Sequence, residues 1–417
     1  MKHYEPIFMP LIWSAILIGV FGGFGLGAHM VFSLGFDFPL NASLAVMMQV
    51  HGRLQLLGWT GLFIMAVSLY KLPRLASAKA FPRFIHPTLM VLVVGGLLLQ
   101  TISQLFFFYS PMSLELKFGV AAGSLLIAVG IIVFVVVIAR VVHQAKVKAE
   151  AVAAKEIWPF LVISLCGWLL YAFSQVIAAI SFLNNSSFLF DATVNNLAVQ
   201  TFIFALLLPT CFAFSISTFP IFLRLRAPTW PVRRVASVYA IGVAMNLGAL
   251  SAISYFNVDS FRVIAAIGGL IRSLAIIWFI IELDLLRFHA PWFRKYRDNA
   301  DRANHPPRRY TADYGQFGNF EWIIYAAYLW LGIASLYDIW NEMLVIVGTV
   351  PVTGLIAQSI LRHLYLLGFV THLILGMAVR MVPGFLGKNA VAYPKLVNLS
   401  FLFISLAIIS RILPLWF

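Results

Sequence analysis

The chain has 417 residues, of which 62% are hydrophobic and only 11% are charged. Soluble globular domains carry about a quarter charged residues, so this composition excludes that class and predicts an integral membrane protein. The formal net charge of +14 does not indicate nucleic-acid binding, because the cations fall in short segments between apolar runs.

Apolar runs long enough to cross a bilayer follow one another along the chain, and each transmembrane helix needs about 20 such residues. The first run is read as a span, because Met1 to Pro10 offers no small-residue site for signal-peptide cleavage. The sequence predicts an all-α, polytopic bundle of eleven transmembrane helices. Their ranges are 8–34, 43–70, 86–109, 116–142, 157–183, 194–223, 233–256, 261–287, 319–340, 352–382 and 393–415. Cys166 and Cys211 fall within spans, which predicts core residues without a disulfide.

Positive charge alternates between the connecting segments. Loops after even-numbered spans are basic, whereas loops after odd-numbered spans carry almost no Lys or Arg. The positive-inside rule then places the amino terminus and the even loops in the cytoplasm, and we expect a bacterial inner membrane. The longest even loop, 289–318, contains Pro306-Pro307 and mixed charge, so it is predicted to be a solvated cytoplasmic linker.

An internal repeat relates spans two, six and ten. A single shift of 310 residues lays Gly58 on Gly368 and Pro73 on Pro383, and a weaker copy closes span six at Pro220. The three prolines are separated by 147 and 163 residues, which corresponds to a period of four spans. We predict a single transmembrane domain with pseudo-threefold repeats at about 8–142, 157–287 and 319–417. The alternative is chance alignment of Leu-rich helices that end at interfacial prolines.

Four histidines lie within spans, where an ionisable residue is a functional candidate. With the predicted orientation His29, His51 and His363 share the outer third, and His372 follows His363 by nine residues on the same helix. For any one of them the alternative is a core imidazole whose hydrogen bonds are satisfied. Two histidines at similar depth on repeat-related helices predict instead a b-type haem with His51 and His363 as its axial ligands.

A porphyrin is flat and apolar, with acidic propionates at one edge. Trp59 and Phe369 are expected to line a slot for it, together with Phe63 and Tyr365. Arg53 and Arg411 are candidates to pair with the propionates. Snorkelling of both arginines to the interface is the alternative.

Span two carries a motif with a family resemblance. Its sequence reads His51-Gly52-Arg53-Leu54-Gln55-Leu56-Leu57-Gly58-Trp59 and closes at Leu72-Pro73-Arg74. This stretch resembles the haem-ligand helices of haem–copper oxidase and nitric oxide reductase catalytic subunits. It is more similar to the NnrS family, membrane haem proteins of the nitric oxide response, whose late motif resembles His363 through Gly368 to Arg380. The resemblance implies a bis-histidine haem on His51 and His363 and a twelve-span, pseudo-threefold bundle.

The sequence also departs from those families. Leu361 stands where the oxidases place the ligand of the active-site haem, and spans six and seven contain no histidine for copper. Arg53 stands where NnrS-like motifs often show a second histidine, and the family's twelfth span is either missing or lies beyond this chain. Oxygen reduction at a haem–copper centre is therefore not expected.

Other polar residues within spans leave alternatives open. Arg272 and Arg380 are expected to form buried pairs or to begin a proton path, with pairing favoured. Asp338 and Glu342 would suit a small copper or zinc site together with His29.

The sequence thus predicts a membrane haem protein of the nitric oxide response. Its haem would either pass electrons from an unidentified donor or bind nitric oxide. One alternative is a cofactor-free secondary transporter, with His372, Arg272 and Arg380 lining its substrate path. Another is a quinol-linked electron-transfer subunit.

Overall fold

The computed structural model describes residues 8–39, 43–79, 81–110, 113–147, 152–185, 187–223, 230–256, 260–286, 316–349 and 355–413. The chain divides into two compact units, Met1–Thr210 and Cys211–Phe417. In the described ranges the secondary structure is helical and contains no strand, which confirms the predicted all-α bundle.

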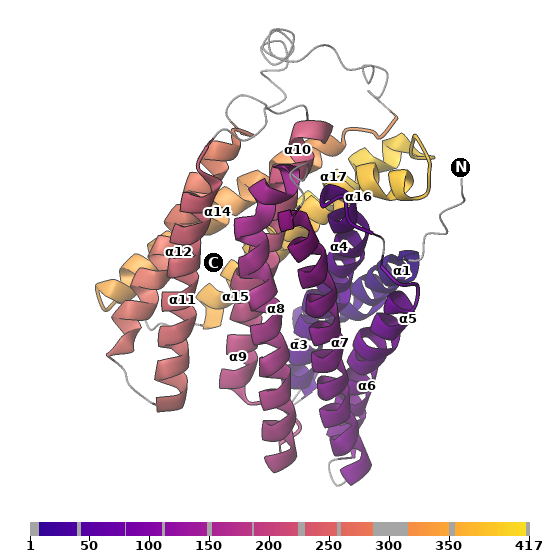
Figure 1. Ribbon diagram of the computed structural model, residues 1–417. Coiled ribbons are helices and arrows are strands. Elements are labelled where there is room, and N and C mark those ends of the chain that lie inside the picture. The colour runs from indigo at the N-terminus through magenta and orange to yellow at the C-terminus, as the bar shows by residue number, and fades with distance from the viewer. Residues whose placement is uncertain are drawn as a thin grey trace, which may run out of the picture. The chain divides into compact units, whose positions relative to one another are not determined.

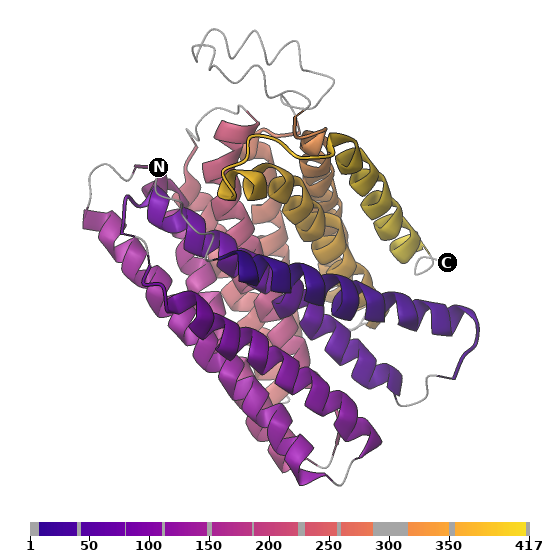
Figure 2. The same cartoon turned by 90° about the vertical axis from the view of Figure 1, so that its right-hand side faces the viewer.

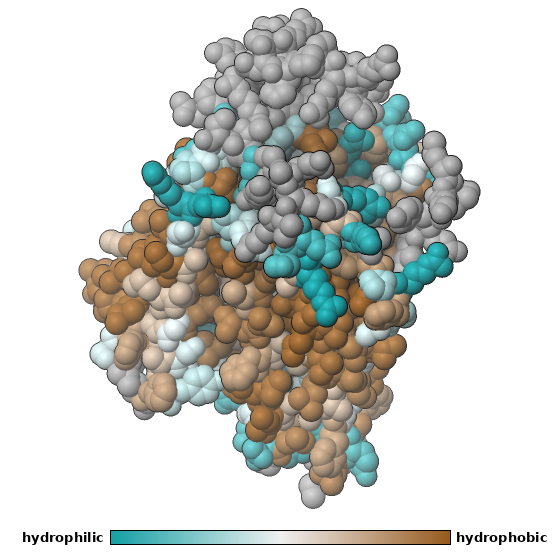
Figure 3. Space-filling model, in the orientation of Figure 1, coloured by the Kyte–Doolittle hydropathy of each residue, from teal (hydrophilic) through white to brown (hydrophobic). Residues whose placement is uncertain are grey.

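In the part of the chain that the structure describes, eleven helices are long and apolar enough to cross a membrane, as predicted. They are Met9–Gly35, Ser43–Leu75, Ile85–Tyr109, Leu114–Gln144, Glu156–Asn184, Ala192–Phe222, Val232–Phe256, Phe261–Leu283, Phe320–Ile346, Ile356–Phe385 and Pro394–Ile412. Figure 3 shows hydrophobic side chains along the middle of the helices and hydrophilic ones toward their ends. The protein is therefore a multi-pass membrane protein whose helices contact lipid. Most of the predicted linker, 289–315, lies outside the described residues.

The described part of the first unit contains six spans, and four of these spans combine α-helical with π-helical segments. Their parts are α1 (Met9–Leu17), η1 (Ile18–Phe24) and α2 (Gly25–Gly35); α3 (Ser43–Arg53), η2 (Leu54–Gly61) and α4 (Leu62–Leu75); α5 (Ile85–Leu89), η3 (Met90–Gly95) and α6 (Gly96–Tyr109); α7 (Leu114–Val147); α8 (Val152–Asn184); and α9 (Ala192–Gln200), η4 (Thr201–Leu207) and the start of α10 (Leu208–Phe222). Helix α7 packs along both α6 and α8 (Figure 1, Figure 2). Polar side chains of α6 and α8 are thereby enclosed in this unit.

The second unit contains the rest of α10 and five further spans. They consist of α11 (Val232–Phe256), α12 (Phe261–Leu283), α14 (Phe320–Ile346), α15 (Leu355–His363) with η7 (Leu364–Thr371) and α16 (His372–Phe385), and α17 (Pro394–Ile412). Helix α12 packs against α11 and α14, and η7 packs against α14. Gly242 and Gly268 leave no room for a Cβ between α11 and α12, since it would overlap the backbone of Arg272 or of Asn246. This close approach brings two polar residues, Asn246 and Arg272, side by side.

Spans two, six and ten share a local design that the sequence alone does not show. Each contains a π-helical segment, in which the turns are wider than in an α-helix. The segments begin at Leu54, Thr201 and Leu364, each 19 residues before the proline of its span. Each helix ends two residues after that proline, at Leu75, Phe222 and Phe385. The common register supports the predicted four-span period.

The packing of these spans on the preceding spans follows the same register. The shifts that relate the prolines also relate Gly58, Ala205 and Gly368. A Cβ on Gly58 would overlap Ile18, and one on Gly368 would lie 3.0 Å from Trp330. In span six the small partner is on the preceding helix, because a Cβ on Gly167 would overlap the backbone of Ala205. Each repeat thus contains a helix pair held closely together at one position.

This register corrects one assumption behind the predicted haem ligands. His363 corresponds to Arg53, and His51 corresponds to Leu361, so the two histidines are offset by two residues. On a helix that offset is about 3 Å along the axis and about 200° around it. The two histidines therefore keep similar positions along the axes of their repeat-related helices, but they project from different sides of these helices.

Candidate functional site

His51 lies at the end of α3 and packs against the first span. Its Nδ1 is 2.9 Å from the carbonyl oxygen of Gly23 in η1. The ring fits because Gly27 has no side chain, since a Cβ there would lie 2.8 Å from His51 Cε1. A carbonyl oxygen only accepts, so this bond assigns the hydrogen to Nδ1 and leaves the lone pair on Nε2.

His363 is held in the same way in the second unit. Its Nδ1 is 2.7 Å from the carbonyl oxygen of Ser359, one turn earlier on α15. Its Nε2 accepts a hydrogen bond from Nε of Arg411 at 3.2 Å, and Nη2 of Arg411 lies 3.4 Å from Ser359 Oγ. The structure therefore brings two predicted site residues together, His363 and Arg411.

His372 is fully buried and opens α16. Its Nδ1 lies 3.0 Å from the carbonyl oxygen of Leu367, and its Nε2 is buried without a hydrogen-bond partner. His29, by contrast, is exposed on α2. No group of three His, Cys, Asp or Glu side chains that could hold a metal occurs among the described residues.

Two of the four aromatic residues predicted to line a haem slot, Trp59 and Phe369, are packed within their own units. The ring of Trp59 lies 6.4 Å from that of Phe24 and 6.0 Å from that of Phe63. The ring of Phe369 is fully buried, 5.4 Å from that of Tyr328. His51 and Trp59 belong to the first unit and His363 and Phe369 to the second, so the axial pair and the shared slot stay predictions.

Arg53 lies on the opposite face of α3 from His51 and is buried, with 8% of its surface exposed. Its Nη2 donates to Oε1 of Gln104 on α6, and its Cζ stands 4.7 Å from the ring centre of Phe190. Its Nε and Nη1 are buried without hydrogen-bond partners. This burial disfavours the alternative, in which the side chain extends to the interface.

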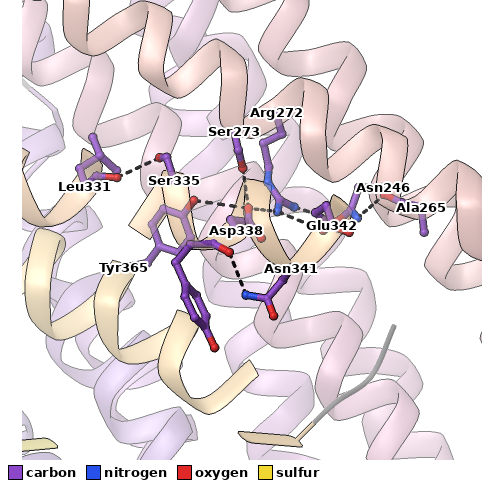
Figure 4. A network of polar contacts seen from close by, with 11 residues as sticks. Asn246, Ala265, Arg272, Ser273, Leu331, Ser335, Asp338, Asn341, Glu342 and Tyr365 are labelled. Atoms are coloured by element: carbon purple, nitrogen blue, oxygen red, sulfur yellow. Dashed lines mark hydrogen bonds and ion pairs between the residues drawn. The ribbon is translucent and has the colours of Figure 1, made fainter. Parts of the chain in front are cut away.

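A second buried arginine organises the polar interior of the second unit (Figure 4). Arg272 of α12 forms an ion pair with Asp338 of α14 at 2.5 Å, and only 2% of each side chain is exposed. Oδ2 of Asp338 also accepts from Ser273 Oγ at 2.5 Å, and Tyr365 Oη lies 3.5 Å away. Glu342 adds a second carboxylate, 3.9 Å from Nη2 of Arg272.

Asn246 completes this network from α11. Its Oδ1 accepts from Nη1 of Arg272 at 2.9 Å, and its Nδ2 donates to the carbonyl oxygen of Ala265 at 2.8 Å. The expected buried pairing of Arg272 is thus observed. Asp338, considered above as a metal ligand, is instead bound to Arg272 and Ser273, which satisfy its charge.

Sequence reasoning did not single out the amides that contact the two arginines. Gln104 and Asn246 are both at most 4% exposed within otherwise apolar spans. The sequence did contain a signal for them, namely an amide within an apolar span, because a buried amide in a membrane helix requires hydrogen-bond partners. Arg380, the other arginine considered for buried pairing, stacks on Phe317 with its Cζ 4.1 Å from the ring centre.

Neither a scan against models of known protein families nor a search of curated protein sequences finds a match for this chain.

Proposed function

We propose that this membrane protein binds a b-type haem, with His51 and His363 as the axial ligands. The observation that carries the proposal is the bond of each Nδ1 to a backbone carbonyl oxygen, at 2.9 Å for His51 and 2.7 Å for His363. Histidines that bind metal typically donate their other ring N–H to such an acceptor, which fixes the ring and its tautomer. In both residues the nitrogen that carries the lone pair is then Nε2, which in His363 accepts a hydrogen bond from Nε of Arg411.

The residues around His363 also fit the acidic edge of a haem. The guanidinium of Arg411 donates to Nε2 of His363, so it lies close enough to this ligand atom that it would be the group to pair with a propionate if haem were bound there. Arg53, buried without a carboxylate partner, is a second candidate for a propionate. Trp59 and Phe369, each buried in its own unit, are the aromatic residues proposed to lie beside the porphyrin.

The haem would supply one-electron chemistry, or would bind a diatomic gas if one histidine releases the iron. The resemblance of His51–Gly58 and of His363 through Arg380 to NnrS motifs favours a role in the response to nitric oxide. In this proposal the protein lies in a bacterial inner membrane with its amino terminus in the cytoplasm, and an unidentified donor reduces it. Copper is no part of the proposed centre.

An optical spectrum of the purified protein, oxidised and then reduced, tests the proposal. We expect a Soret band with the sharp visible bands of a low-spin b-type haem, and metal analysis should find iron. Nitric oxide added to the reduced protein then tests gas binding by a shift of the Soret band. A protein expressed with ample haem that shows no Soret band contradicts the proposal.

A second candidate, a cofactor-free secondary transporter, is favoured by one observation in the second unit. Two carboxylates share one arginine there, and the same unit contains the unpartnered Nε2 of His372. Charges buried in a membrane protein often mark substrate or proton pathways. Absence of a Soret band, combined with proton uptake into proteoliposomes that Glu342→Gln abolishes, would favour this candidate.

A further inference from the structure

Arg53 has hydrogen-bond donors for which the described residues offer no acceptor. One nitrogen, Nη2, donates to Oε1 of Gln104. The other two, Nε and Nη1, are enclosed and have no partner, although together they carry three hydrogens. With 8% of the residue exposed, water on the outside of the bundle does not solvate them.

No acidic side chain among the described residues balances the charge of Arg53. Arg53 makes no ion pair with any described residue, whereas Arg272 makes two. Asp191, next to Phe190 in the chain, is exposed, and its Oδ1 accepts from the backbone N–H groups of Thr193 and Val194 at 3.0 Å. Tyr171 of α8 is buried in the same unit, but a phenol supplies no negative charge near neutral pH. Because arginine stays protonated in proteins, the buried guanidinium requires an anion as its counter-charge.

The groups around the guanidinium are held in place before any ligand arrives. Nε2 of Gln104 donates to Gln49 Oε1 and to the carbonyl oxygen of Phe188, both at 3.1 Å, so its Oε1 is the end that faces Arg53. Gln49 in turn bonds both backbone groups of Phe190. Its Nε2 donates to the carbonyl oxygen at 2.9 Å, and its Oε1 accepts from the backbone N–H at 3.0 Å. These bonds join α3, α6 and the segment before α9 into a neutral frame around one cation.

We infer that Arg53 is the cationic centre of a buried oxyanion site in the first unit, and that the group it takes is a carboxylate. A planar guanidinium with free N–H donors matches a carboxylate in shape and charge. The neutral amides of Gln49 and Gln104 orient the cation without cancelling its charge. The Phe190 ring covers one face of the guanidinium, which directs the ligand to its edge.

This carboxylate has two sources that the same chemistry allows. One is a haem propionate, and that source rests on the proposed function. The other is a free small carboxylate, which needs no haem.

The test uses Gln104→Glu, which places a carboxylate next to Nη2 of Arg53 and so supplies the missing counter-charge from within. Thermal unfolding of the purified protein is followed in sodium acetate and in sodium chloride of equal ionic strength. We expect acetate to raise the melting temperature of the wild-type protein saturably, by on the order of 2 °C. Gln104→Glu should melt higher than the wild type in chloride and should not respond to acetate.

Two further variants control this experiment. Arg53→Met removes the charge, keeps much of the side-chain length and should abolish the acetate response. Arg74→Met removes an arginine that donates to the carbonyl oxygen of Tyr70 and should retain the response. If Arg53→Met does not fold, Gln104→Glu still decides the outcome.

The Soret band separates the two sources. If a propionate occupies the site, protein with a Soret band ignores acetate, and Gln104→Glu lowers its haem content. If a free carboxylate occupies the site, the acetate response is present whether or not a Soret band is seen. The inference is overturned if the wild-type protein does not respond to acetate and Gln104→Glu changes neither the melting temperature in chloride nor the haem content. Absence of the Soret band alone contradicts only the haem proposal.

Discussion

Arg53 in the first unit and Arg272 in the second are the same cation in the same kind of apolar bundle. Their exposed fractions are 8% and 2%, and each donates to a side-chain amide oxygen, of Gln104 or of Asn246. They differ in the acids around them. Arg272 has Asp338 at 2.5 Å and Glu342 at 3.9 Å, whereas Arg53 forms no ion pair with a described residue.

The difference shows how a buried charge in a membrane helix can be interpreted. A cation that its own chain neutralises is explained by the fold, and removing its partner should destabilise the protein. A cation that its own chain leaves without a counter-charge is better explained by something that the protein binds. Arg53 and Arg272 are alike in residue type and burial. Only their partners therefore distinguish a structural arginine from one that binds a ligand.

The largest effect is expected when Asp338 loses its charge. Asp338→Asn leaves Arg272 buried with only the more distant Glu342, and breaking a buried ion pair in this way costs about 3–5 kcal/mol. We expect a much lower yield of folded protein and a lower melting temperature in detergent. The double variant Arg272→Leu with Asp338→Leu should be less destabilised than Asp338→Asn. A single variant as stable as the wild type would remove the contrast between the two arginines.

A smaller effect is expected from Gly269→Ala. The added methyl group would overlap Oε1 of Glu342 and force the second carboxylate away from Arg272. Overpacking of this kind costs roughly 1–3 kcal/mol in folding stability. Gly332→Ala is the matched control, because a Cβ there meets no atom within 4 Å. Combining Gly269→Ala with Glu342→Ala should recover most of the loss in a double-mutant cycle, and no recovery would mean that the overlap is not with Glu342.

The smallest effect on stability is expected from Arg53→Met in the absence of ligand. This variant loses one hydrogen bond, worth about 1 kcal/mol, but it also removes a buried charge that has no counter-charge. The melting temperature should therefore stay within a few degrees of the wild type or rise. Arg272→Met, measured beside it, should fall much further because it strands Asp338. Equal losses in the two variants would show that Arg53 is as structural as Arg272.

The membrane topology was predictable from the sequence because a bilayer demands long apolar runs, and all eleven expected spans are present. The pairing of Arg272 was expected as well. Its partner was not, because Asp338 is on another helix and only packing brings the two together. The amides of Gln104 and Asn246 were overlooked, although their position within apolar spans was visible.

The π-helical segments could not be predicted from residue type. The segments 54–61 and 364–371 are apolar runs that a uniform α-helix would accommodate equally well. Their common register shows that His363 corresponds to Arg53 and not to His51. Depth in the membrane had suggested equivalent histidines because it ignores the direction in which each side chain leaves its helix.

The axial pair of His51 and His363 is the central proposal, and the low-spin ferric signal in electron paramagnetic resonance tests it most directly. The wild-type protein, His51→Ala, His363→Ala and the control His29→Ala are compared at equal protein concentration. We predict that the wild type and His29→Ala show the signal of a bis-histidine haem, and that the other two variants lose it or convert it to high spin. An unchanged low-spin signal in either His51→Ala or His363→Ala would contradict the proposed ligands.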